Sequence, residues 1–244
     1  MLILSIDTST TVCSVALHKD GQVLACYELF AEKSSSGMLT TLIQNGVQHT
    51  GHELAQLDAV AVAKGPGSYT GLRIGVSTAK GLCYALDKPM IAVNTLEAMA
   101  RQISGQWRVV GGHSTHQSIN PSTHPTLFCP MLDARRMEVY AAVYDADGRE
   151  VMPTTAVIVD EHSFAEVLAE QPVLFFGNGA AKCEPVLGQH PNARFLNALV
   201  QPSARTVGEL AARAYAEGRF EDVAAFEPFY LKDFMGTKPK KAVV

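Results

Sequence analysis

The sequence is poor in cysteine, in tryptophan and in charge. It holds five cysteines and one tryptophan among 244 residues, and 18% of its residues are charged. No two cysteines form a CxxC pair, so neither a zinc ribbon nor a disulfide framework is expected, and the pattern is typical of a reduced cytoplasmic protein. The cysteines are Cys13, Cys26, Cys83, Cys129 and Cys183.

Long apolar runs and a surplus of basic residues are also missing. No apolar run approaches the ~20 residues that span a bilayer. The apolar start, Met1–Ile6, ends at Asp7 without a basic flank, unlike a signal peptide. The net charge is −4, whereas proteins that grip nucleic acid alone are usually basic. The one basic cluster, Lys238, Lys240 and Lys241, predicts a flexible tail over 236–244.

The chain is rich in apolar residues (47%), and they recur in one order, used twice. An apolar strand ends at Asp7, a hairpin turns at Asp20-Gly21, a helix-like segment covers 36–49, and the strand 57–63 enters Gly65-Pro66-Gly67. The hairpin glycine follows the aspartate by 14 positions. This order is one α/β unit, with an antiparallel hairpin and parallel crossovers in one mixed sheet.

The same order returns from Leu127 onward. A strand ends at Asp133, a hairpin turns at Asp147-Gly148, 15 positions after that aspartate, and the strand 173–176 enters Gly177-Asn178-Gly179. The repeat predicts an α/β protein of two similar lobes, each a mixed five-stranded sheet flanked by helices. The predicted boundaries are 1–100 plus about 203–235 for the first lobe and 101–202 for the second.

The densest glycine stretch, Gly65–Gly71, has two possible interpretations. It could hold a phosphate at a helix N-terminus, although it lacks the ending of a P-loop. Alternatively, it is a tight turn in which Ser68 or Thr70 caps the helix. Glycine inside a helix costs roughly 1 kcal/mol relative to alanine, so Gly71 and Gly75 suggest close approach of another helix, either internal or from another chain.

The aspartates at the two strand ends also allow two interpretations. Asp7 and Asp133 could position a metal–phosphate complex or could cap their own turns, and Arg135 and Arg136 make an ion pair the simpler role for Asp133. The Gly177–Gly179 turn could let a flat base lie against the backbone, or be an ordinary turn.

A metal site and a serine nucleophile find little support. Three histidines, His113, His116 and His124, share one polar stretch, but their spacing is loose and no cysteine or carboxylate lies among them, so zinc is not expected. A G-x-S-x-G elbow is also missing.

Several motifs together resemble one family. The duplicated topology resembles the ribonuclease H-like fold of actin, sugar kinases and heat-shock ATPases, and the motifs resemble TsaB, the dimerisation subunit of the bacterial machinery for threonylcarbamoyladenosine in tRNA. The stretches that carry this resemblance are Ile3–Thr10, Gly65–Gly75, Ala79–Leu82, Asp133–Tyr140 and Gly177–Gly179.

The resemblance implies a subunit without catalytic residues or a metal of its own. Thr95 and Met99 stand where the homologous catalytic subunit TsaD carries a metal-binding histidine pair, and neither is a competent ligand. It also implies a degenerate nucleotide site with no required cofactor and, at most, weak ADP or ATP binding. The residues of that site are Asp7, Thr8, Ser9, Gly177 and Gly179.

The resemblance further implies a scaffold that docks on TsaD through helices 36–49 and 70–86, or on a second copy of itself when TsaD is absent. The complex includes the ATPase TsaE, contacts tRNA mainly through the partners, and modifies N6 of the adenosine beside the anticodon in tRNAs reading codons that begin with A. Where many relatives carry a histidine near the first helix, this chain has Ser35-Ser36-Gly37. The implied interface residues are Met38, Leu42, Ile43, Gly71, Ile74, Gly75, Thr78 and Leu82.

Two enzymatic hypotheses compete with the scaffold. One is an ATP-dependent kinase or ATPase of the same fold, which would use Asp7–Ser9 and the Gly177–Gly179 turn. The other is a glycoprotease, an activity for which the sequence offers no histidine pair or nucleophile set.

Overall fold

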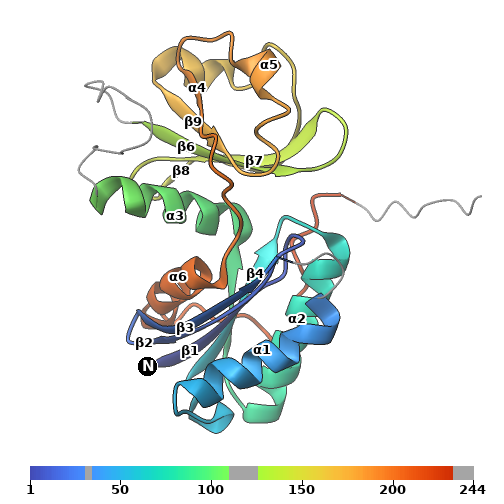
Figure 1. Cartoon of the computed structure of the whole chain (residues 1–244), viewed down its shortest axis with the longest axis vertical. Coiled ribbons are helices and arrows are strands. Elements are labelled where there is room, and N and C mark those ends of the chain that lie inside the picture. Colours follow the sequence, from blue (N-terminus) through green and yellow to red (C-terminus); the bar gives the residue numbers. More distant parts are fainter. Residues whose placement is uncertain (31–34, 110–125, 233–244) are drawn as a thin grey trace, which may run out of the picture.

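A computed structural model describes residues 1–30, 35–109 and 126–232, which form two lobes one above the other (Figure 1). The three histidines of the polar stretch and the lysine-rich tail lie outside the described residues. Within the described ranges, no helix is both long and apolar enough to cross a membrane.

The first lobe is built on a five-stranded sheet of order β3-β2-β1-β4-β5. β1 pairs antiparallel with β2 and parallel with β4, so the sheet is mixed. The hairpin turns at Asp20 and Gly21, which have φ values of 50° and 79°, because a tight two-residue turn needs left-handed backbone. The strands are β1 (Leu2–Asp7), β2 (Cys13–Lys19), β3 (Gln22–Leu29), β4 (Ala59–Gly65) and β5 (Met90–Asn94).

The second lobe repeats this arrangement in a sheet of order β10-β9-β6-β7-β8. β6 pairs antiparallel with β7 and parallel with β9, as β1 does with β2 and β4. The predicted two-lobed fold is therefore confirmed. The strands are β6 (Leu127–Asp133), β7 (Glu138–Tyr144), β8 (Glu150–Ile158), β9 (Val173–Phe176) and β10 (Ala193–Phe195).

Helices cover both faces of the first sheet. α1 (Ser35–His49) and α2 (Tyr69–Leu86) lie side by side on one face, and α6 (Ala204–Ala216) lies on the other (Figure 1). A short 3₁₀ turn, Leu54–Gln56, precedes β4. The Ser68 hydroxyl caps α2 by accepting a hydrogen bond from the Gly71 N–H at 3.3 Å. α2 buries an apolar stripe at helical spacing: Leu72, Val76, Ala79 and Cys83.

The second sheet is covered by α3 (Thr95–Val109) on one face and by α4 (Ala165–Glu170) and α5 (Glu184–Leu187) on the other. Leu96 and Met99 of α3 are buried against the second sheet, in one cluster with Phe128. The predicted boundary at residue 100 therefore falls inside α3, which connects the lobes. α6 returns to the first sheet, where Val207 packs with residues of β1 and β4.

Candidate functional site

The carboxyl end of β1 holds an aspartate that is folded into its own turn. The Asp7 side chain is 1% exposed, and its Oδ1 accepts hydrogen bonds from the Ser9 N–H at 2.9 Å and the Ser9 hydroxyl at 2.7 Å. Within the described chain, no group donates to Oδ2. Burial raises the pKa of Asp7 to about 6, because a charged carboxylate is poorly solvated there.

The glycine-rich loop before α2 closes over this turn. A Cβ on Gly67 would lie 2.2 Å from the Ser9 carbonyl oxygen, and one on Gly71 would lie 2.0 Å from the Thr8 carbonyl oxygen. The Ser68 N–H donates to the Ser9 carbonyl at 2.6 Å, and the Thr8 hydroxyl donates to the Gly71 carbonyl at 2.7 Å. The loop is therefore packed against backbone of the same lobe.

This packing corrects the interpretation of the small residues in α2. The sequence suggested that Gly71 and Gly75 let another helix approach. Both are buried instead, and a Cβ on Gly75 would lie 2.4 Å from the Thr8 hydroxyl oxygen. The element that approaches is the β1–β2 turn of the same chain, because β1 ends directly beneath the first turns of α2.

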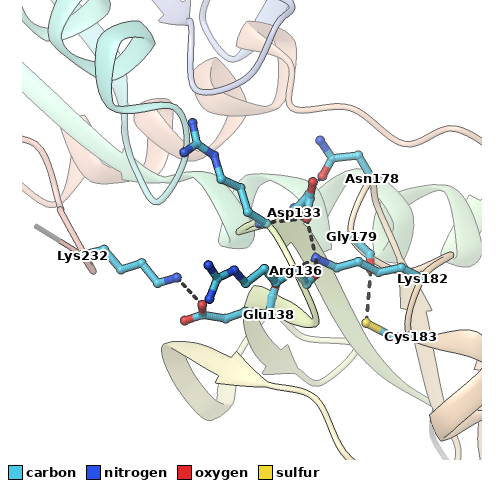
Figure 2. Close-up of polar contacts among 9 residues, drawn as sticks. Asp133, Arg136, Glu138, Asn178, Gly179, Lys182, Cys183 and Lys232 are labelled. Atoms are coloured by element: carbon cyan, nitrogen blue, oxygen red, sulfur yellow. Dashed lines mark hydrogen bonds and ion pairs between the residues drawn. The ribbon is translucent and has the colours of Figure 1, made fainter. Parts of the chain in front are cut away.

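The equivalent aspartate of the second lobe lies in a more open setting. The Asp133 side chain is 48% exposed and forms an ion pair with Lys182. The Lys182 ammonium also donates to the carbonyls of Arg136 at 2.6 Å and Glu138 at 2.7 Å (Figure 2). The prediction that Arg135 or Arg136 pairs with Asp133 is wrong. Those two residues form the left-handed turn itself, with φ values of 69° and 49°, and Lys182 comes to Asp133 from the segment after the second glycine loop.

The second glycine loop packs against the end of β6. A Cβ on Gly177 would lie 2.4 Å from the Met131 carbonyl oxygen, and one on Gly179 would lie 2.9 Å from the Leu132 carbonyl carbon. Between them, the Asn178 side-chain oxygen accepts a hydrogen bond from the Asp133 N–H at 2.9 Å. The backbone of Gly177 and Gly179 is therefore covered by β6. Asn178 is a polar contact that sequence reasoning did not assign.

The two positions that the resemblance assigned to a histidine pair of TsaD lie in the core. Thr95 and Met99 are fully buried at the start of α3, and the Met99 methyl carbon lies 2.9 Å from where a Cβ of Gly177 would be. Among the described residues, no group of three His, Cys, Asp or Glu side chains gathers as metal ligands would.

The remaining predicted residues belong to α1 and α2, where some are buried and others are exposed or partly buried. Leu42 and Ile43 are buried in the first core of the single chain, and their contact with a partner stays a prediction. Met38 is 38% exposed. Along α2, Ile74, Thr78 and Leu82 recur every four residues and are partly buried.

Two residues of α2 that sequence reasoning left without a role complete this surface. Nothing lies within 4 Å of a Cβ placed on Gly81, and the Tyr84 side chain is 87% exposed. Among the glycines of α2, Gly81 therefore faces open space, whereas Gly71 and Gly75 do not. Gly81 and Tyr84 are three residues apart on one helix, and this spacing could have placed them on the same outer surface. We call Met38, Ile74, Thr78, Gly81, Leu82 and Tyr84 the α1–α2 face.

Two lobes with the same mixed strand order define the class as a duplicated α/β fold with one five-stranded sheet in each lobe. A family model described as "TsaD: tRNA N6-adenosine threonylcarbamoyltransferase" matches residues 29–235. A structure from Pseudomonas aeruginosa, titled as similar to the peptidase YeaZ, superposes with a TM-score of 0.76 at 26% identity and covers 95% of this chain and 99% of its own.

Two full-length relatives identify the family within this class. The tRNA threonylcarbamoyladenosine biosynthesis protein TsaB of Escherichia coli is 34% identical over 98% of this chain and 97% of its own. TsaB of Bacillus subtilis is 32% identical over 95% of this chain and 94% of its own. The chain belongs to the TsaB family, as its motifs predicted.

Proposed function

We propose that this chain is a non-catalytic subunit in threonylcarbamoyladenosine biosynthesis, and that it docks on the catalytic subunit TsaD through the α1–α2 face. TsaD then transfers the threonylcarbamoyl group to N6 of the adenosine beside the anticodon. The ATPase TsaE completes the assembly, which works in the cytoplasm. tRNA is contacted mainly through the partners, in keeping with the net charge of −4 on this chain.

The composition and packing of the α1–α2 face carry the proposal. Tyr84 is almost fully exposed, Met38 is partly exposed, and Gly81 has open space beside it. An exposed aromatic side chain one helical turn from an open glycine, with an exposed methionine on the neighbouring helix, is typical of a surface that receives another helix. Aromatics and methionine are enriched at interfaces, and glycine permits close backbone approach.

The relationship between this chain and TsaD supports the same face. The family model described as TsaD matches this chain from residue 29 to residue 235, a range that includes both helices. Two homologous chains can therefore present equivalent helix pairs to each other around an approximate twofold axis, as two copies do in an isologous dimer. The same geometry lets this chain form a homodimer when TsaD is absent.

The lobe interiors support a role that requires no cofactor on this chain. Thr95 and Met99 fill the positions of the catalytic histidines with buried side chains. The Gly67–Gly71 loop closes the Asp7 turn, where an actin-like ATPase would place nucleotide phosphates. We infer that any ADP or ATP bound by the isolated chain is held weakly.

An ATP-dependent kinase or ATPase remains the second candidate, and one observation favours it. The Asp7 Oδ2 atom is buried without a hydrogen-bond donor in the described chain, so opening of the glycine loop would leave a carboxylate ready for a cation. Calorimetry of the isolated chain with Mg-ATP separates the two functions. Micromolar affinity with turnover would support the enzyme, and neither is expected from the scaffold.

The docking experiment uses Gly81→Leu, with Gly105→Leu in α3 as the matched control. Both glycines lie in helices with open space at the Cβ position, so both variants should fold at least as well as the original chain. We expect Gly81→Leu to weaken TsaD binding at least tenfold, about 1.4 kcal/mol, and Gly105→Leu to leave it unchanged. Mass photometry of the chain alone and mixed with TsaD and TsaE provides the measurement. Equal binding by the two variants would refute this docking face.

A further inference from the structure

The chain continues after α6 as an irregular segment that sequence periodicity did not predict. We call residues 221–232 the C-terminal strap. It begins beside the first sheet, where the Glu221 N–H donates to the Met90 carbonyl at 2.9 Å. The Lys80 ammonium of α2 then donates to the carbonyls of Ala224 at 3.1 Å and Phe226 at 3.0 Å. The strap is thus tied to α2 through one side chain.

The next contacts place the strap across the carboxyl end of β4. The Phe229 N–H donates to the Lys64 carbonyl at 2.7 Å, and the Phe229 carbonyl oxygen lies 2.8 Å from where a Cβ of Gly65 would be. The Tyr230 ring packs against the ring of Tyr69, the first residue of α2, with centroids 4.8 Å apart and planes tilted by 32°. The strap therefore holds the strand that enters the first glycine loop and the helix that leaves it.

The strap ends on the second lobe. Lys232 forms an ion pair with Glu138 (Figure 2), and its ammonium lies 6.0 Å from the centroid of the Tyr140 ring. Glu138 is the first residue of β7, and its backbone carbonyl accepts a hydrogen bond from Lys182. One segment therefore contacts α2 at one end and the turn that carries Asp133 at the other.

The strap joins the first lobe through apolar as well as polar contacts. Val223 and Phe226 pack against the first core, which includes Val76 and Cys83 of α2. A cavity of about 330 Å³ lies between the strap and the helix, and its lining includes Lys80, Tyr69 and Tyr230. The strap is therefore anchored to α2 on both sides of this cavity by side chains that the helix itself supplies.

We propose that the C-terminal strap is a brace that couples α2 to the second lobe, so that the position of the β6–β7 turn depends on contacts made at α2. At about 100° per residue, Tyr69, Arg73 and Lys80 lie on one flank of α2, and Ile74, Thr78 and Leu82 lie on the other. Gly81 and Tyr84 lie on the outer side between the two flanks. One rigid helix thus connects the strap and the proposed docking face. The part of this inference that concerns the partner rests on the proposed function. The coupling is reciprocal, so contacts at the β6–β7 turn also affect binding at α2.

Hydrogen exchange of the full-length chain tests the brace without a partner. Lys80→Met keeps an apolar stem and removes the donors to the strap, and Lys19→Met, at the end of β2, is the control. We expect Lys80→Met to raise the exchange rate about fivefold in the strap and in the β6–β7 turn. The reason is the loss of the hydrogen bonds that the charged Lys80 ammonium donates to the strap. The turn is reported by the N–H groups of Ala134 and Glu138, which donate within it.

Two further measurements keep the proposal open to refutation. Glu138→Gln breaks the contact from the second lobe and should raise exchange in the strap by a similar factor. If Lys80→Met loosens only the strap, and the β6–β7 turn keeps its original exchange rate, the brace is wrong. Addition of TsaD should slow exchange in the turn of the unmodified chain and do so less in Lys80→Met. A chain that does not bind TsaD would refute the docking proposal and leave the first test unaffected.

Discussion

The two lobes have an aspartate at the same point of the same topology, but the two carboxylates differ in burial and in hydrogen-bond partners. Asp7 ends β1 and is buried, with Oδ1 bonded to Ser9 and Oδ2 unpartnered in the described chain. Asp133 ends β6, is half-exposed and is paired with Lys182. The strand order is identical around both, so the topology does not determine the chemistry at this position.

The difference comes from what packs above each strand end. In the first lobe, the glycine loop approaches the backbone of Thr8 and Ser9 and seals the turn. In the second lobe, the glycine loop approaches the backbone of Met131 and Leu132, and the segment after it contributes an ammonium group to the aspartate. Two glycine loops that make similarly close contacts thus leave one carboxylate desolvated and the other solvated.

Disrupting the close packing of the first glycine loop on the Asp7 turn should have the largest effect on stability. Gly71→Ala places a methyl group 2.0 Å from the Thr8 carbonyl oxygen, so the helix or the turn must move, and we expect a loss of about 4 kcal/mol in the free energy of unfolding. Urea denaturation measures it. Gly81→Ala, in open space on the same helix, should instead stabilise the protein by roughly 0.5–1 kcal/mol. Equal effects of the two variants would contradict the close approach.

Neutralising Asp7 should have the next largest effect, and in the stabilising direction. The pKa of Asp7 is raised from 3.8 to about 6, so the folded state binds a proton that the unfolded state has lost, and stability falls as pH rises from about 4 to about 6. Asp7→Asn removes this dependence while Oδ1 still accepts from Ser9. We expect the variant to be more stable by roughly 2–3 kcal/mol at pH 8.

The pH series of the same variant supplies its control. The advantage of Asp7→Asn over the original chain should shrink toward zero near pH 4, where the original carboxyl is protonated in the folded state and mostly protonated in the unfolded state. Thermal or urea unfolding across this range gives the measurement. An advantage that does not change with pH would mean that the charge of Asp7 is not its cause.

The corresponding change in the second lobe should be the smallest and of the opposite sign. Asp133→Asn breaks a partly exposed pair with Lys182, for which we expect a loss of about 0.5–1 kcal/mol. Because the pair is reached by solvent, the loss should diminish in 1 M salt, where the Debye length is about 3 Å. A loss as large as that of Gly71→Ala would erase the contrast between the lobes.

Much of the fold followed from the sequence because its signals are local. Apolar runs marked the strands that end at Asp7 and Asp133 and the strands 57–63 and 173–176, helical spacing marked the first helix, and turn residues such as Asp20-Gly21 marked the hairpins. One strand left out, β10, has three residues, too few for a period to be visible. The C-terminal strap was missed because it has no periodicity and is held by contacts such as Lys80 to Ala224, which are 144 positions apart.

The candidate site was predictable in kind and not in detail. Two glycines in one helix indicated a close approach, but nothing in their spacing distinguishes the backbone of Thr8 from a partner helix. The sequence placed Arg135 and Arg136 next to Asp133, yet neighbours on a tight turn point away from one another, and Lys182 completes the pair from a later segment.

By itself, the sequence determined the duplicated α/β architecture and the family, since both are written in residue types at short spacing. Tertiary structure alone decided that Gly81 is the α2 glycine beside open space and that Asp133 is the more exposed aspartate. It also decided that the last described residues connect α2 to the second lobe. Those outcomes depend on which chain-distant surfaces meet, and burial, not residue type, then fixes whether a polar group is sealed, paired or left free to bind.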